Sequence, residues 1–418
     1  MSITTAIQNA RTKIAAAYTS CNNKDATMPA AGSQNLTNLA PTIDTIVTDI
    51  PFNQTIQTVN RNEEDGVVTY TRGEEYVGIM TVLPSRKYEN DTTLVKALLP
   101  DTVNVISSHA FQGCTNLKYT NLENVEQIHE WAFEGCTSLE YIDLSNAIRV
   151  DQLAFYNCTN LKIDLVWPDS IPIITRAVFR HSGVRSAKLN ISAFGGDFTF
   201  SNCTNLISVD LSESTITTTY CAATTEGGTF SGCSSLKTVL LPLTCTELGN
   251  FSFFYCTSLE TVTGTGNVTV IRNNAFRECN SLGNFDMSSV ETIETFSLTH
   301  TNLTTVNLPS IVTIQGSIYG GAPFIGCSEL EYVDIGPNCE YIGEFAFQGC
   351  YSLDTVIVRA TVPPETGQRM FFDTNATFKL YVPYSADHSI ISAYQNATNW
   401  TTYASQMYEL NPDGTIPV

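Results

Sequence analysis

Charged side chains are scarce in this sequence, and positively charged ones are the scarcest. Charged residues make up 15% of the 418, and 21 Lys and Arg stand against 41 Asp and Glu, giving a formal net charge of -20. This excess of negative charge repels phosphate backbones and anionic headgroups. We therefore expect no nucleic-acid partner, and we expect a neutral or cationic glycan, a protein or a divalent cation instead.

Long apolar runs are also missing. No segment reaches the roughly 18 consecutive apolar residues that a membrane-spanning helix requires, so membrane insertion is not expected. The first residues, Met1 to Ile7, lack a basic segment followed by an apolar core. That pattern is required of a secretory signal peptide, so we expect none.

The local signatures of common enzymes are absent as well. The sequence contains no His-Glu-x-x-His, no Gly-x-Ser-x-Gly and no Gly-x-x-x-x-Gly-Lys segment. The five histidines are scattered along the chain at positions 109, 129, 181, 300 and 388. A catalytic triad can assemble from distant residues, but no motif points to one. We expect a protein that is not an enzyme and that has no catalytic residues or cofactor.

Cysteine is abundant, and most of the cysteines recur in one repeated motif. Nine of the 13 cysteines lie in one frame, Phe-x-x-Cys-x-x-Leu, and most neighbouring copies are 22 or 23 residues apart, within the range of leucine-rich repeats. Phe179 with Ser182, and Phe296 with Thr299, are predicted to be degenerate copies. The nine repeat cysteines are Cys114, Cys136, Cys158, Cys203, Cys233, Cys256, Cys279, Cys327 and Cys350.

The repeat cysteines have two interpretations. A zinc or disulfide ladder would need paired Cys-x-x-Cys or Cys/His clusters, and none occurs. Small, buried hydrophobic thiols are the simpler interpretation. The remaining four, Cys21, Cys221, Cys245 and Cys339, lie outside the frame, and the odd total argues against complete pairing. We expect free thiols and no metal.

Each repeat predicts a strand and a return segment. Segments such as Leu206 to Leu211 alternate apolar and polar residues after the cysteine, as a short β-strand does. Val125, Ile128 and Phe133 then supply a second apolar group before the next cysteine. One such coil cannot bury these residues alone, whereas stacked coils can. The sequence predicts an α/β leucine-rich-repeat solenoid over residues 92–360, with a parallel β-sheet on one face.

The sequence of the repeats resembles that of the BspA-like leucine-rich-repeat proteins of bacterial and protist surfaces. Residues 99–114, Leu-Pro-Asp-Thr-Val-Asn-Val-Ile-Ser-Ser-His-Ala-Phe-Gln-Gly-Cys, carry the pattern, and residues 380–383 and 394–403 resemble the family's closing segment. The resemblance covers about residues 92–410 and assigns residues 361–418 to a C-terminal cap. It implies a secreted or surface-exposed adhesin or binding module. The expected lack of a signal peptide departs from that family.

The first 60 residues follow a different pattern. Ile3, Ile7 and Ile14 lie on a short heptad seam, and a second seam begins at Leu36 after a Gly-Ser-Gln-Asn break. Two interpretations stay open: a helical hairpin with its own small core, and a module that forms homo-oligomers or docks onto a partner. The sequence of residues 6–18 and 28–39 is similar to the N-terminal sequences of structural proteins of phages and prophages. Residues 61–91 are predicted to be a β-rich junction, with a turn over 61–66.

The strand positions that point outward should stack into columns about 4.8 Å apart. Polar and aromatic residues dominate two of these columns, so they are candidates for binding a glycan or a cation such as calcium. The alternative is an ordinary solvated sheet face, with Lys188 between Asp164 and Asp210 balancing their charge. The candidate binding residues are Tyr119, Asn121, Tyr141, Asp143, Asp164, Asp210, Asp286, Asn307, Tyr332 and Asp334.

Two insertions interrupt the period, at residues 212–229 and 315–323. Such loops are either recognition elements or tolerated surface variation. Three functions follow from the sequence. The first is a virion protein that binds a host surface glycan or protein through the repeats and other virion proteins through its N-terminus. The second is a bacterial surface adhesin, on the cell surface or secreted. The third is a structural spacer without a ligand.

Overall fold

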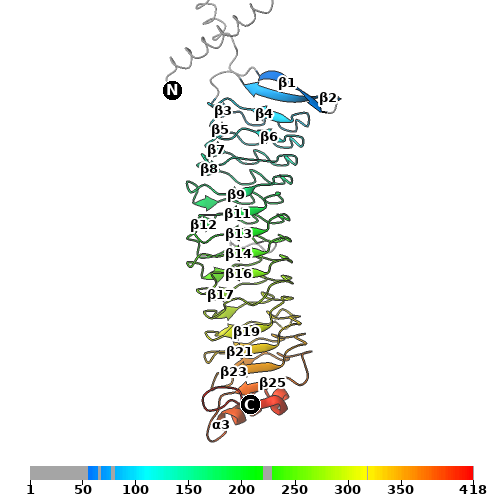
Figure 1. Ribbon diagram of the computed structural model, residues 1–418. Coiled ribbons are helices and arrows are strands. Elements are labelled where there is room, and N and C mark those ends of the chain that lie inside the picture. Colours follow the sequence, from blue (N-terminus) through cyan, green and yellow to red (C-terminus); the bar gives the residue numbers. More distant parts are fainter. Residues whose placement is uncertain (1–54, 65–66, 77–80, 220–227, 318, 418) are drawn as a thin grey trace, which may run out of the picture.

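The computed structural model describes residues 55–64, 67–76, 81–219, 228–317 and 319–417, with backbone alone for residues 55–76. The heptad seam at Ile3, Ile7 and Ile14 and the helical module predicted for residues 1–60 therefore lie almost wholly outside the described residues. From residue 81 onward the chain winds into a solenoid of stacked coils (Figure 1). Within these described ranges, no helix has both the length and the apolar composition needed to cross a membrane.

A first ladder of parallel strands runs along one side of the coils, where the repeat motif predicts them. It is interrupted twice and is closed by β26 (Met407–Glu409). Its other solenoid strands are β4 (Lys96–Leu98), β6 (Tyr119–Thr120), β9 (Asp164–Val166), β11 (Ser186–Lys188), β13 (Ser208–Asp210), β14 (Thr238–Leu240), β16 (Thr261–Thr263), β19 (Thr305–Leu308), β21 (Tyr332–Ile335), β23 (Thr355–Val358) and β25 (Lys379–Val382).

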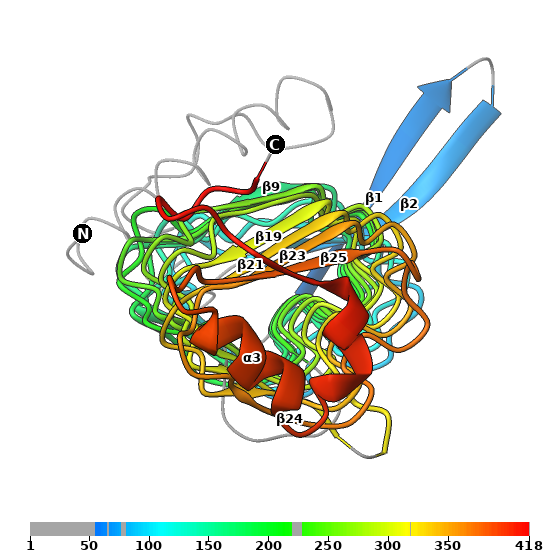
Figure 2. The same ribbon diagram turned by 90° about the horizontal axis from the view of Figure 1, so that it is seen from below.

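A second ladder of very short parallel strands is formed by the return segments, on a different side of each coil (Figures 1 and 2). Its strands are β3 (Val82–Leu83), β5 (Val105–Ile106), β7 (Gln127–Ile128), β8 (Arg149–Val150), β10 (Ile173–Ile174), β12 (Ala193–Phe194), β15 (Glu247–Leu248), β17 (Val270–Ile271), β18 (Thr292–Ile293), β20 (Thr313–Ile314), β22 (Tyr341–Ile342) and β24 (Glu365–Thr366).

The predicted leucine-rich-repeat solenoid is confirmed, but its secondary-structure content and its first and last residues differ from the prediction. The described part of the chain contains little helix beyond α3 (Ser389–Asn396) and the 3-10 helix η1 (Thr401–Gln406), so the solenoid is mainly β rather than α/β. The second ladder already begins at Val82, before the predicted start at residue 92. The first ladder continues through β25 and β26, which lie in the range expected to be a cap.

An antiparallel hairpin precedes the first coil. It consists of β1 (Thr55–Glu64) and β2 (Val67–Tyr76), so strand structure begins within the range assigned to the helical module, and the predicted turn at 61–66 is mostly strand. Gly73, Glu74 and Glu75 of β2 pair in parallel with β4 and join the hairpin to the first ladder. The rest of the hairpin projects beyond the outline of the coils (Figure 2).

The repeat phenylalanines form a continuous stack inside the coils. Phe111 and Phe133, for example, are fully buried, and their ring centroids lie 5.0 Å apart in a stacked arrangement. Similar contacts continue coil by coil from Tyr88 to Phe276 and resume from Phe324 to Phe371. Burial of each ring contributes roughly 1.5–3 kcal/mol, so this stack is a major part of the core.

The repeat cysteines are buried thiols that donate hydrogen bonds to backbone carbonyls of the preceding coil. Cys136 donates to the Phe111 carbonyl at 3.1 Å, and Cys256 donates to the Phe230 carbonyl at 3.1 Å. All nine repeat cysteines are buried thiols. These carbonyls also accept a backbone amide of their own coil, so the thiol adds a second bond to them, and a small apolar residue with one donor fits the buried position.

One predicted frame was wrong. The Phe276 amide bonds the Ser297 carbonyl, as the Phe253 amide bonds that of Ala275, so Leu298 and Thr301 replace Phe and Cys rather than Phe296 and Thr299. The Thr301 hydroxyl lies 3.3 Å from the Cys327 sulfur, where another thiol would lie. Phe296 instead has a left-handed backbone, at φ 57°, at the corner of the coil. This Leu298 explains why the phenylalanine stack pauses between Phe276 and Phe324.

Left-handed corners recur in every coil, and they explain the glycines before the repeat cysteines. Gly113 has φ +70°, a conformation that costs other residues about 1–2 kcal/mol. A Cβ atom on Gly113 would also collide with the side chain of Asn90 on the preceding coil. Glycine therefore serves both the turn and the close stacking of the coils.

Candidate functional site

The first ladder is interrupted between β6 and β9, because the coil between them has no strand pairing. The coil after it has one residue more between its buried ends: Leu161 to Trp167 spans six steps, whereas Leu139 to Leu144 spans five. The extra residue makes burial alternate strictly from Leu161 to Trp167. The extra residue shifts the outward-facing side chains of this coil by one position relative to those of the preceding coil, and no strand pairing joins the two coils.

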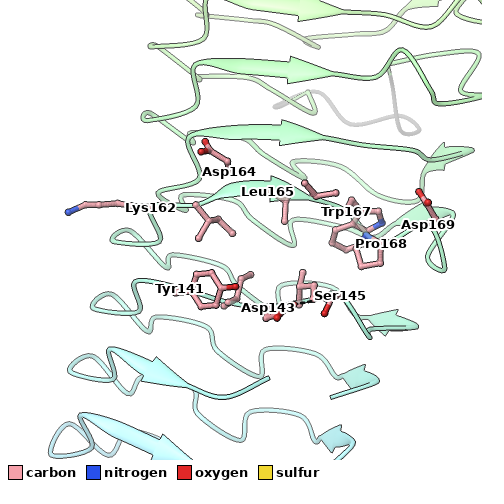
Figure 3. Close-up of a pocket in the computed structure, with 13 residues that line it drawn as sticks. Tyr141, Asp143, Ser145, Lys162, Asp164, Leu165, Trp167, Pro168 and Asp169 are labelled. Atoms are coloured by element: carbon pink, nitrogen blue, oxygen red, sulfur yellow. Dashed lines mark hydrogen bonds between the residues drawn. The ribbon is translucent and has the colours of Figure 1, made fainter. Parts of the chain in front are cut away.

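A groove of about 530 Å³ opens at this mismatch, lined by residues 141–145 and 162–169 (Figure 3). We call it the Tyr141 groove. At the second interruption, between β16 and β19, the Asn284 side chain fills the gap by bonding the Thr304 amide and hydroxyl at 2.9 Å each. No side-chain hydrogen bond links residues 141–145 to residues 162–169, all of which the structure describes, so the first gap stays open.

Apolar surface forms the walls of the Tyr141 groove. Tyr141 is 52% exposed on one coil, and Val166 is 70% exposed on the other. Behind them, Trp167 is buried, and its indole N–H donates to the Ile171 carbonyl at 2.8 Å. The Trp167 ring also packs edge-on against Phe179, with centroids 6.0 Å apart, which fixes this wall on the core. Exposed rings and aliphatic groups on a fixed wall are typical of ligand pockets.

Three carboxylates supply polar groups along the groove, and one oxygen of each accepts a hydrogen bond from the protein. Oδ1 of Asp143 accepts from the Ser145 amide at 2.9 Å, Oδ1 of Asp164 from the Ser186 hydroxyl at 2.8 Å, and Oδ1 of Asp169 from Asn190 at 3.0 Å. Within the described residues, each Oδ2 has no hydrogen bond. These oxygens can therefore accept hydrogen bonds from ligand hydroxyl groups.

The structure thus brings together three of the predicted binding residues, Tyr141, Asp143 and Asp164, but it corrects the column of Asp164. Asp164 pairs with Ser186, and Lys188 pairs with Val166 and Asp210. Asp164 therefore lies in the third-position column, and Lys188 does not lie between Asp164 and Asp210. Lys188 instead pairs with Glu213 at 3.0 Å. The extra residue in the Leu161 coil causes this shift.

Other predicted residues have structural partners. Asp210 accepts from the Ser212 amide and hydroxyl at 2.9 and 2.7 Å, and Asp286 accepts from the Ser288 amide at 2.9 Å. Such bonds close the turn after the strand. Asn121 bonds both the amide and the carbonyl of Leu99, at 2.6 and 2.8 Å, and so joins adjacent coils. These contacts favour a structural role for the three residues.

Acidification should weaken the two carboxylate turns. The hydrogen bonds from Ser212 and Ser288 lower the pKa values of Asp210 and Asp286 below their usual value. A lowered folded-state pKa means that the stabilisation is complete above the unfolded-state pKa, about 4, and is lost as the pH falls through the folded-state value. We expect an Asp210→Ala, Asp286→Ala variant to be less stable than the wild type at pH 6, with the difference shrinking below about pH 4. Urea midpoints measured across this range check this; a difference independent of pH would contradict it.

The remaining predicted residues lie outside the groove lining, Tyr119 on the coil just before that of Tyr141 and the others far along the solenoid. Tyr119 is half-buried on β6 under the Lys96 ammonium, 5.3 Å from its ring centroid. Asn307 is exposed on β19, opposite Asp334 of β21. Asp334 is buried, and Arg359 binds both its carboxylate oxygens at 2.7 Å.

Tyr332 also contacts the Asp334–Arg359 pair. The Tyr332 hydroxyl donates to Asp334 at 3.2 Å, and burial raises the pKa of Tyr332. The Arg359–Asp334 pair also raises the pKa of Arg359. Because its carboxylate is already paired with Arg359, these contacts favour a structural role for Asp334.

Some groove residues were not predicted. Lys162, Val166, Trp167 and Asp169 line the Tyr141 groove, and the signal for them was the extra residue in the Leu161 repeat together with a rare tryptophan. As for calcium, the described ranges hold no group of three or more His, Cys, Asp or Glu side chains placed to bind a metal ion.

Comparisons with known proteins agree with this architecture. A model of the "BspA type Leucine rich repeat region (6 copies)" matches residues 81–195, 146–225, 196–323 and 318–406. A search of curated proteins found no match.

Solved structures with detectable similarity include a leucine-rich repeat protein from Bacteroides ovatus, 18% identical, with TM-score 0.42 and coverage of 86% of this chain and 100% of that one. The pneumococcal vaccine antigen PcpA is 15% identical, with TM-score 0.38 and coverage of 85% and 97%. The family model, whose matches span most of the chain, decides the assignment. The chain belongs to the BspA-type leucine-rich-repeat family.

Proposed function

We propose that this chain is a non-enzymatic adhesion protein whose Tyr141 groove binds a surface glycan. The observation that carries the proposal is the groove itself, which combines an exposed aromatic ring and an exposed aliphatic side chain with three carboxylates. Sugar rings present C–H faces to an aromatic ring and hydroxyl donors to carboxylate oxygens. Membership of a repeat family that typically provides binding scaffolds supports the same class of function.

The rigidity of the groove supports this proposal further. Trp167 and Ile142, behind the walls, are buried in the core, and one oxygen of each groove carboxylate is already fixed by a hydrogen bond. A site whose groups are held in place before binding loses less entropy when the ligand docks.

A glycan array tests the proposal with the full-length chain. We expect selective binding by the wild type and a roughly tenfold weaker affinity after Tyr141→Ala, because the stacking face is lost. Tyr351→Ala is the matched control, since Tyr351 is 60% exposed on a distant coil. Absence of any glycan binding, or equal binding by Tyr141→Ala and the wild type, would refute the proposed function and favour the spacer.

We further propose that the chain is a virion protein, with an N-terminal segment that contacts other virion proteins or forms homo-oligomers. The support is the sequence of residues 6–18 and 28–39, which is similar to phage structural proteins. A bacterial surface or secreted adhesin is the alternative, since BspA-type repeats are typical of surface proteins. Mass spectrometry of purified virions distinguishes the two: detection of the chain there supports the virion, and detection only on cell surfaces contradicts it.

A further inference from the structure

A second hollow, of about 520 Å³, lies beside the Tyr141 groove. It is formed where the strands of the first ladder begin, and we call it the Ile207 hollow. Lys162 lines both cavities, and its side chain extends away from the groove (Figure 3). The hollow is lined by Lys162, Arg185, Asn205, Ile207, Ser235, Lys237 and Ser258.

The register of the coils explains how this hollow forms. Arg185, Ile207 and Lys237 occupy the same position on three successive coils, because the Ile207 amide bonds the Arg185 carbonyl at 2.7 Å and the Lys237 amide bonds the Ile207 carbonyl at 2.8 Å. Adjacent strands lie about 4.8 Å apart, so Arg185 and Lys237 begin about 10 Å from each other. Ile207, 47% exposed, forms a short apolar floor between the two long cations.

The hollow concentrates positive charge on a chain with little of it. Lys162, Arg185 and Lys237 gather here, although the chain has a net charge of -20. Within the described part of the chain, Lys162 and Arg185 form no ion pair. One nitrogen of Arg185 donates to the Lys162 carbonyl at 2.8 Å, which orients the guanidinium and leaves its other nitrogens available.

Lys237 does have a partner, but a weak one. It pairs with Glu260 at 3.2 Å, and both side chains are more than half exposed, so a ligand anion can compete with this pair. Asn205, Ser235 and Ser258 add polar groups to the lining of the hollow. Among the described residues, these three side chains make no hydrogen bond. The hollow therefore offers cations, an apolar floor and unused hydrogen-bonding groups.

We infer that the Ile207 hollow binds an acidic group, a carboxylate or a sulfate, carried by a sugar residue of the ligand. Lys162, Arg185 and Lys237 supply the counter-charge, the hydroxyl and amide groups donate hydrogen bonds, and Ile207 contacts the ring. Since Lys162 borders both cavities, one oligosaccharide can occupy the Tyr141 groove and place its acidic residue in the hollow. The inference rests on the proposed function in taking the ligand to be a glycan.

Three hexasaccharides test the inference on the full-length chain by calorimetry: an oligogalacturonate, which carries carboxylates, its carboxyl-reduced neutral form, and a heparin-derived hexasaccharide, which carries sulfates. We expect an acidic hexasaccharide to bind about tenfold more tightly than the neutral form, as charge-assisted hydrogen bonds allow. The advantage should largely disappear when the salt concentration rises from about 0.1 M to about 1 M. Preference for the oligogalacturonate identifies a carboxylate ligand. Because heparin also carries carboxylates, a preference for the heparin fragment identifies a sulfate ligand when desulfation of the fragment removes it.

Substitutions in the Ile207 hollow test whether the acidic group binds there. Arg185→Glu, and independently Lys237→Glu, should lower the affinity for the acidic probe to that for the neutral probe or below it. Lys379→Glu is the matched control, because this exposed lysine lies on β25, far along the solenoid. Equal affinity for acidic and neutral probes, or equal loss in Arg185→Glu and Lys379→Glu, overturns the inference. If Tyr141→Ala still weakens neutral binding in that case, the proposed function stands; if no probe binds and the glycan array shows no binding either, both fail.

Discussion

Replacement of Phe253 by alanine is expected to lower the free energy of unfolding by roughly 3–5 kcal/mol. Phe253 is fully buried, and its ring stacks between those of Phe230 and Phe276, with centroids 5.5 and 5.2 Å away. Alanine would remove both ring contacts and leave a cavity in the middle of the stack. Urea unfolding followed by circular dichroism measures the loss.

Phe372→Ala is the control for this prediction. Phe372 lies at a coil corner and is 45% exposed, so we expect its replacement to cost less than about 1 kcal/mol. Similar losses for the two variants would contradict the view that the buried phenylalanine stack holds the coils together. Because each coil contacts only its neighbours, hydrogen exchange should show the Phe253→Ala destabilisation spreading from its own coil.

Asp334→Ala is expected to lower the free energy of unfolding by about 3 kcal/mol, because it leaves the Arg359 guanidinium partly buried without its carboxylate. Arg359 binds both oxygens of Asp334 and also donates to the Gly414 carbonyl at 3.2 Å. The pair therefore holds the end of the chain against β21 and β23. Chemical unfolding and limited proteolysis of the C-terminal segment would measure the two consequences.

The Lys188–Glu213 pair provides the comparison. Its atoms lie 3.0 Å apart, but the two side chains are 47% and 58% exposed, whereas that of Asp334 is 12% exposed. Water screens the exposed pair, so Lys188→Ala should cost less than about 1 kcal/mol. If Lys188→Ala and Asp334→Ala were equally destabilising, burial would not be the cause that we assign.

The repeat core was predictable because its signal is repeated. The Phe and Cys positions recur in nearly every coil, and stacking requires the same residue to be buried each time. The degenerate coil shows the limit of this reasoning. Phe296 matches the motif by residue type, yet the backbone bonds place Leu298 and Thr301 in the core. Stacking geometry, rather than the nearest phenylalanine, decides the frame.

The candidate site was predictable in part, for a physical reason. Tyr141 and Asp143 follow from the repeat positions that face outward. The groove itself arises from a register mismatch between two coils, and a column drawn from one repeat pattern does not contain that mismatch. Asp164 was placed in the wrong column for this reason. The partner of Asp334 was missed because Arg359 lies beyond the two columns considered, and side-chain reach across coils is not visible in a linear pattern.

Hydrogen–deuterium exchange of the full-length chain, with and without a glycan selected on the array, tests the central claim most directly. If the Tyr141 groove is the binding site, the glycan will protect peptides covering residues 139–145 and 161–169 and leave the coils from residue 305 onward unchanged. Protection confined to residues 305–335, with none at the groove, would contradict it.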